Sequence, residues 1–177
     1  MNTKYKQLQQ AAEQRGFTII EVVLVLAIAG LIFLMVFLAL PALQRGQRDT
    51  QRREDLSRIS TQINSYSTNA RGKIPTDSTL GDFVSKYLGD GASSVQAGPE
   101  YADPSGVPTD SGIDGADPDK GYIVQYSDAE VSKEGTVYYT AGYVCGDGGA
   151  ITSGKARNYA LRIKLENQSA AACIDNR

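Results

Sequence analysis

The hydrophobic residues of this chain are concentrated in one long run near the N-terminus. Residues 22–40 contain no charge and almost nothing polar. An α-helix rises about 1.5 Å per residue, so this run would span roughly 28 Å, close to the hydrocarbon thickness of a bilayer. A chain of 177 residues is too short to surround such a helix with a soluble core. The pattern therefore predicts a single membrane-spanning helix.

The segment before this run, residues 1–16, is short and polar, and Lys4, Lys6 and Arg15 make it positive. A secretory signal would instead have an apolar core of 7–15 residues followed by a small-residue cleavage site, and nothing resembling such a site follows residue 40. By the positive-inside rule, we expect this leader to stay in the cytoplasm and the part of the chain that follows the membrane helix to lie outside.

A helical pattern resumes after Pro41, which should loosen the helix rather than end it because it removes one backbone donor. Apolar residues then recur at three- and four-residue steps on an otherwise charged helix. The residues of this stripe are Leu56, Ile59, Ile63 and Tyr66. Residues 69–72 should close the helix, and Pro75 prevents its return. The stripe predicts that another element covers it.

After Pro75, the pattern of apolar and polar residues indicates a short helix and three strands. The helix should open near 76–78 and close at Gly89, followed by a turn-rich stretch over 89–120. Its apolar residues are Leu80, Phe83, Val84, Tyr87 and Leu88. Period-two alternation predicts strands at 122–127, 136–145 and 159–166, with Val137, Tyr139, Ala141, Tyr143 and Cys145 on one face of the second.

These elements predict an α+β fold in which a small antiparallel sheet packs on the amphipathic half of one long helix. In the third strand, apolar and charged residues alternate most clearly, namely Leu161, Ile163 and Leu165 with Arg162, Lys164 and Glu166. We expect four parts along the chain: a leader at 1–16, a transmembrane helix at 17–43, an amphipathic stem at 44–74 and a globular head at 75–177.

The net charge of −2 conceals an asymmetry between stem and head. Residues 44–73 carry seven basic and three acidic groups, whereas residues 74–177 carry eight basic and fifteen acidic groups. Opposite charge favours association of the stem of one copy with the head of another. Simple solubility of two exposed faces is an equally good explanation.

The side-chain chemistry offers little to an enzyme. The chain has no histidine, which excludes histidine triads, histidine acid–base catalysis and histidine metal ligands. Catalysis by carboxylates alone has no positive support, so we predict no catalytic residue. Four aspartates in the turn-rich stretch could gather a calcium ion, but their spacing misses the EF-hand pattern and turns are rich in aspartate anyway. They are Asp110, Asp114, Asp117 and Asp119. We therefore predict no cofactor.

The two cysteines, Cys145 and Cys173, form an even count in a chain that carries an export signal. Such a count suggests one disulfide, with two free buried thiols as the alternative.

The sequence Arg15-Gly16-Phe17-Thr18-Ile19-Ile20-Glu21 lies where the polar leader meets the apolar run. Here the chain resembles the type IV prepilin family, which includes the pilins and the pseudopilins of type II secretion. The resemblance is specific over residues 10–40 and architectural beyond them. It implies that a membrane aspartyl peptidase cuts between Gly16 and Phe17 and methylates the new amine of Phe17. Many pilins also close a C-terminal loop with a disulfide, as Cys145 and Cys173 would.

Glu21 is the one charged residue of the predicted membrane helix. A lone carboxylate at the edge of a membrane span costs about 2–3 kcal/mol, and residues 17–44 contain no basic side chain to offset it. Cleavage would create a cation, the amine of Phe17, four residues away. The resemblance implies that Glu21 pairs with the N-terminus of a neighbouring subunit during assembly. The alternative is an acid that reaches up to the lipid headgroups.

One detail departs from the family. Gly30 matches a helix-loosening glycine of many pilins, but their usual proline falls at Leu38, whereas this chain has Pro41. The weakened segment of the helix would then lie later or be longer.

Taken as a pilin, the chain would be a precursor in the cytoplasmic membrane and then a subunit of an extracellular helical filament for adhesion, motility or DNA uptake. Its partners would be further copies of itself, a prepilin peptidase, the assembly machinery and the membrane; a cell-surface or DNA ligand stays open. Two alternatives remain: a minor pilin or pseudopilin of a secretion or competence system, and a bitopic membrane protein whose head binds a ligand without polymerising. Neither Gly16 nor Glu21 would be needed in the last of these.

Overall fold

The computed structural model describes residues 16–89, 95–106 and 121–177. Most of the predicted leader and the four aspartates considered for calcium lie outside these residues. The chain divides into two compact units, one ending at Leu43 and one formed by Gln44–Arg177. We call them the N-terminal segment and the C-terminal unit.

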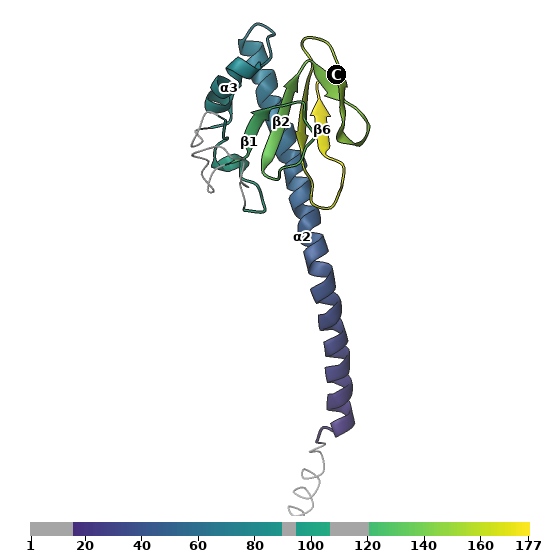
Figure 1. Ribbon diagram of the computed structural model, residues 1–177. Helices are drawn as coiled ribbons and strands as arrows, with labels where there is room; N and C mark the ends of the chain where they lie inside the picture. Colours follow the sequence, from purple (N-terminus) through teal and green to yellow (C-terminus); the bar gives the residue numbers. More distant parts are fainter. Residues whose placement is uncertain (1–15, 90–94, 107–120) are drawn as a thin grey trace, which may run out of the picture. The chain divides into compact units, whose positions relative to one another are not determined.

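One long helix, α2 (Ile19–Asn69), contributes to both units and continues through Pro41, as predicted (Figure 1). Its C-terminus is closed by two residues with positive φ, a backbone conformation that residues other than glycine seldom adopt. Arg71 and Gly72 both have positive φ, 57° and 79°, and the Gly72 N–H donates to the Ser67 carbonyl at 2.7 Å. This six-to-one hydrogen bond is typical of the Schellman motif, and it confirms the predicted end of the helix.

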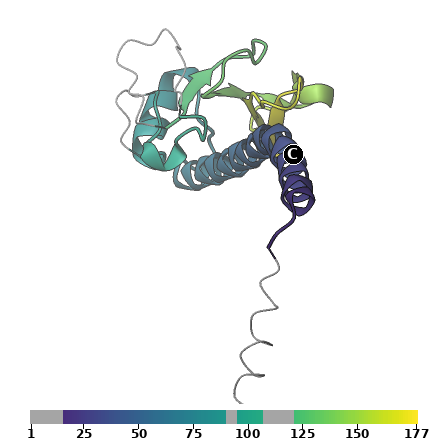
Figure 2. The ribbon, with the colours of Figure 1, turned by 90° about the horizontal axis from the view of Figure 1, so that it is seen from below.

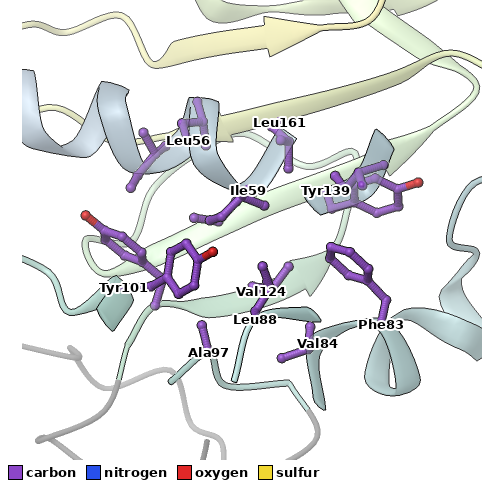
Figure 3. Close-up of a cluster of buried hydrophobic side chains, with 14 of the residues drawn as sticks. Leu56, Ile59, Phe83, Val84, Leu88, Ala97, Tyr101, Val124, Tyr139 and Leu161 are labelled. Atoms are coloured by element: carbon purple, nitrogen blue, oxygen red, sulfur yellow. The ribbon is translucent and has the colours of Figure 1, made fainter. Parts of the chain in front are cut away.

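The apolar stripe of α2 lies in the core of the C-terminal unit, where Leu56, Ile59 and Ile63 are at most 1% exposed. A short helix, α3 (Leu80–Tyr87), follows the one-turn helix η1 (Asp77–Thr79) and covers part of the stripe (Figure 3). Three aromatic rings join the two helices, since Tyr66 meets Phe83 and Tyr87 edge-on with centroids 5.7 and 5.6 Å apart. The predicted stripe and the predicted second helix are both confirmed.

The other cover of α2 is a four-stranded sheet in the order β1-β2-β5-β6 (Figure 2). Its strands are β1 (Ile123–Tyr126), β2 (Thr136–Ala141), β5 (Tyr159–Ile163) and β6 (Ala172–Asp175). The pairs β2–β5 and β5–β6 are antiparallel, which fits the predicted α+β fold, whereas β1 joins β2 in parallel. Another one-turn helix, η2 (Pro99–Tyr101), follows a single bridge from Gln96 to β1.

The predicted strand at 136–145 is wrong in its second half. Gly142 adopts a φ of 79°, which turns the chain out of the first sheet. The residues beyond it form β3 (Tyr143–Cys145), which pairs only with β4 (Ile151–Ser153) in a separate hairpin joined by the one-turn helix η3 (Asp147–Gly149). Tyr143 and Cys145 therefore do not share the core face of Val137 and Tyr139.

The two faces of the first sheet have different surroundings. Val137, Tyr139, Leu161 and Ile163 lie in the core with the stripe of α2, and the Tyr139 hydroxyl donates to the Pro75 carbonyl at 2.7 Å. Because neighbouring side chains of a strand point to opposite faces, Arg162 lies on the face away from α2. We call this the outer face.

Candidate functional site

The N-terminal segment presents a continuous apolar surface. Nineteen large hydrophobic side chains from Phe17 to Leu43 are 45–89% exposed, and within the described part of the chain the most apolar stretch of this helix contains no buried residue. A soluble monomer rarely exposes a contiguous apolar surface of this extent. By length and composition the helix can cross a membrane. The segment therefore fits a membrane-anchored protein.

The start of α2 is built by Thr18 and Glu21. The Thr18 N–H and hydroxyl donate to Glu21 Oε2 at 3.0 and 2.8 Å, and the Glu21 N–H donates to Thr18 Oγ1 at 3.4 Å. Thr18 is the residue before the helix and Glu21 is its third residue, so the two form a reciprocal capping box. This role of Glu21 was not predicted from the sequence, although Thr-x-x-Glu before an apolar run is its recognised signal.

Gly16 and Phe17 lie outside the helix, immediately before the cap. Phe17 is 89% exposed, and a Cβ added at Gly16 would meet no atom within 4 Å. The peptide bond between them is thus in irregular, exposed backbone, the form that a protease can bind. Among the described residues, none lies close enough to Gly16 to require a glycine there.

Within the C-terminal unit, a buried ion cluster joins later segments of the chain to α2. Its members are Arg48, Asp49, Arg52, Asp103 and Glu166. Arg52, which has no exposed surface, donates from Nε and Nη2 to the two carboxylate oxygens of Asp103 at 2.9 and 2.8 Å. A second carboxylate, Glu166, lies 3.1 Å from Arg52 Nη2. A bidentate pair of this kind fixes both distance and orientation, so it holds the 95–106 segment against the helix.

The same cluster holds the connection between β5 and β6. Arg48 donates from Nε and Nη2 to Glu166 at 2.7 and 2.6 Å. Asp49 accepts the backbone N–H groups of Glu166 and Asn167 at 2.8 and 3.0 Å. Three residues of α2 before the apolar stripe, Arg48, Asp49 and Arg52, thus bind two segments that follow far later in the sequence.

The electrostatics of the cluster favour its charged form. Burial alone would raise the pKa of Asp103, but the hydrogen bonds from Arg52 and Ser105 outweigh it and hold this pKa below its usual value. The hydrogen bond from Arg48 likewise lowers the pKa of Glu166. Asp55 behaves oppositely, because burial raises its pKa more than Arg58 and Tyr122 lower it.

This pairing changes the reading of the charge asymmetry. Arg48 and Arg52 form ion pairs with Glu166 and Asp103 of the head, whereas Arg58 pairs with Asp55 of the stem itself. Part of the attraction between basic stem and acidic head is therefore satisfied within one molecule, rather than left for association between copies.

Cys145 and Cys173 form a disulfide, which joins β3 to β6. The Cys145 N–H also donates to Asp175 at 2.6 Å. The bond therefore fastens the β3–β4 hairpin to the edge strand of the first sheet.

The comparison with known protein families identifies one match: the prokaryotic N-terminal methylation motif covers residues 12–37. This motif is the signature of type IV pilins and pseudopilins, so the resemblance found at Gly16–Glu21 is confirmed. A search of curated proteins and a search of solved structures found no match. The chain thus carries the type IV pilin and pseudopilin signature at the start of a hydrophobic N-terminal helix.

Proposed function

We propose that this chain is the structural subunit of a type IV pilus, inserted in the cytoplasmic membrane as a precursor and assembled into an extracellular filament. The observation that carries the proposal is the position of the methylation motif, residues 12–37, directly on an apolar helix that the chain itself leaves uncovered. Lipid covers this surface before assembly. Neighbouring copies of the same helix cover it afterwards, because removing an apolar surface of this size from water is favourable.

The exposed backbone at the start of the helix supports cleavage of the precursor between Gly16 and Phe17. A prepilin peptidase cuts the exposed bond between Gly16 and Phe17 and methylates the new amine. Glu21 then has a second role in addition to the capping box. Thr18 donates both of its hydrogen bonds to one carboxylate oxygen, Oε2, and the carboxylate has further lone pairs that can accept. A second oxygen is available for the Phe17 amine of a neighbouring copy. An unpaired charge in an apolar bundle costs several kcal/mol, so this pairing selects the register in which subunits join.

The test is mass spectrometry of filaments sheared from cells, with and without the prepilin peptidase. We expect the mature chain to begin at N-methylated Phe17, and we expect the intact precursor to remain in membranes of cells without the peptidase. Recovery of Met1 in purified filaments, or a new terminus beyond residue 40, would contradict the proposal. Filament length, measured by electron microscopy in the same preparation, separates a pilus from the short assembly of a pseudopilin.

A further inference from the structure

A pocket on the outer face of the sheet combines a buried cation with an acidic rim. Its volume is about 420 Å³, within the range of small-molecule sites. Arg162 of β5 lines it, together with Asp128 and Glu130 from the β1–β2 connection. The wall opposite is the turn at Gly148–Gly149 between β3 and β4. The pocket lies entirely within the C-terminal unit, so ligand binding there does not depend on filament assembly.

Arg162 is a buried cation with few hydrogen-bond partners. It is 3% exposed, and its Nη2 donates to the Ser127 carbonyl at 2.9 Å. Its Nε is buried without a hydrogen-bond partner, and no carboxylate among the described residues lies within ion-pairing distance. The exposed Asp128 carboxylate and the Tyr138 ring, 5.9 Å from the guanidinium carbon, attract the cation, but neither forms an ion pair or hydrogen bond with it. Burial outweighs both and lowers the pKa of Arg162. Such a group is stabilised by an anion that enters the pocket.

The rim excludes a plain anion. Asp128 and Glu130 are both exposed and line the same pocket, so a ligand that carries only negative charge is repelled at the entrance. A ligand that places a carboxylate on Arg162 and an ammonium group at the rim satisfies both charges. The remaining lining includes the apolar side chains of Val131 and Ile151. These suit an aliphatic side chain.

The pocket is held in shape by the disulfide. Arg162 and Cys173 are directly paired across β5 and β6, so their side chains share the outer face. Cys173 is bonded to Cys145, which precedes the turn at Gly148–Gly149. That turn packs tightly, because a Cβ at Gly149 would lie 2.4 Å from the Ala171 carbonyl oxygen. The wall is therefore fixed next to the arginine before any ligand arrives.

We propose that this pocket binds an aliphatic α-amino acid, with its carboxylate on Arg162 and its ammonium group on Asp128 and Glu130. In the experiment, L-leucine is titrated into the full-length chain in detergent micelles, and binding is measured by isothermal titration calorimetry. Two matched probes remove one charge each: 4-methylpentanoate lacks the ammonium group and 3-methylbutylamine lacks the carboxylate. We expect saturable binding of L-leucine and at least about tenfold weaker binding of each analogue, since each loses a charge-assisted hydrogen bond.

Two variants locate the site. Arg162→Met and the double variant Asp128→Asn/Glu130→Gln should each weaken L-leucine binding about 10- to 100-fold. The control Arg157→Met removes an exposed arginine outside the pocket and should leave affinity unchanged. If Arg162→Met does not fold, the rim variant decides, because its two residues are on the surface. Absence of saturable L-leucine binding up to about 10 mM, or equal affinity for all three probes, overturns the proposal.

Discussion

Replacing Asp103 by Asn tests whether the buried ion cluster carries the stability of the C-terminal unit. In the native chain Asp103 neutralises Arg52, which is fully buried. Asparagine keeps the shape and the turn but offers one acceptor where the carboxylate offered two, and it carries no charge. The guanidinium then remains buried with Glu166 at 3.1 Å as its nearest counter-ion.

The expected loss can be worked out from these contacts. Breaking a buried pair by removing one partner costs about 3–5 kcal/mol, because it leaves a buried charge uncompensated. Here Glu166 still compensates part of that charge, so we expect about 2–3 kcal/mol, the value of one lost charge-assisted hydrogen bond. Domain stabilities are about 5–15 kcal/mol, so the variant should stay folded but unfold measurably earlier.

The assay is urea unfolding of the full-length chain in detergent micelles. Tyrosine fluorescence reports it, because the chain has ten tyrosines and no tryptophan. The matched control is Lys164→Gln, which breaks a 3.6 Å pair whose side chains are 41% and 36% exposed. Exposed pairs contribute about 0–1 kcal/mol, so this control should change the free energy of unfolding little.

A double variant separates charge from packing. Arg52→Met with Asp103→Leu removes both charges, and a well-packed apolar pair often replaces a buried ion pair without loss. We expect it to be more stable than Asp103→Asn. The reasoning is refuted if Asp103→Asn costs no more than Lys164→Gln, or if the double variant is the least stable of the three.

Three further outcomes are expected. Because the pKa of Glu166 is lowered in the folded chain, its contribution is present above the unfolded value of about 4.3 and is lost as pH falls through the folded pKa; Glu166→Gln should therefore flatten the decline in urea midpoint between about pH 5 and 3. Glu21→Gln should abolish filaments seen by electron microscopy, whereas Thr18→Ala, which loses the cap but keeps the carboxylate, should retain them; equal filament numbers in both would contradict the charge role of Glu21. Cys145→Ser should speed amide exchange in β6 and the β3–β4 hairpin far more than in α2, since opening a loop that spans a sequence separation of 28 removes roughly 3–4 kcal/mol; uniform loss of protection would contradict it.

The elements that sequence predicts well here are those with local periodicity. The stripe of α2 and the alternation of β5 each repeat within one segment, so the pattern alone locates them. The strand β6 has no such pattern: Ala172–Asp175 is half-buried throughout and depends on its pairing with β5 and on the disulfide. The parallel pairing of β1 with β2 is likewise set by tertiary structure, since the strand pattern predicted an antiparallel sheet.

The buried charges show the same limit more clearly. Asp49, Arg52 and Asp55 read in the sequence as part of a solvated helix face, yet each is at most 4% exposed. Each of them has a hydrogen-bond partner 51 or more positions away, so a local window does not contain the full reason for their burial. Arg162 and its pocket are assembled from three separate connections and escape prediction for the same reason. The Thr18–Glu21 cap, in contrast, is fully local and could have been predicted.

The ion cluster also sets the order in which the chain can fold. Its bonds from Arg48 to Glu166 and from Asp49 to Asn167 each close a separation of 118 residues. Contacts so distant form late, because the entropy of the intervening chain must be lost before they contribute, and folding slows to milliseconds or longer. During synthesis, the ribosome completes the membrane helix and its stem long before Glu166 emerges. For that interval the stripe of α2 has no sheet to cover it, which makes the nascent stem a natural client for chaperones.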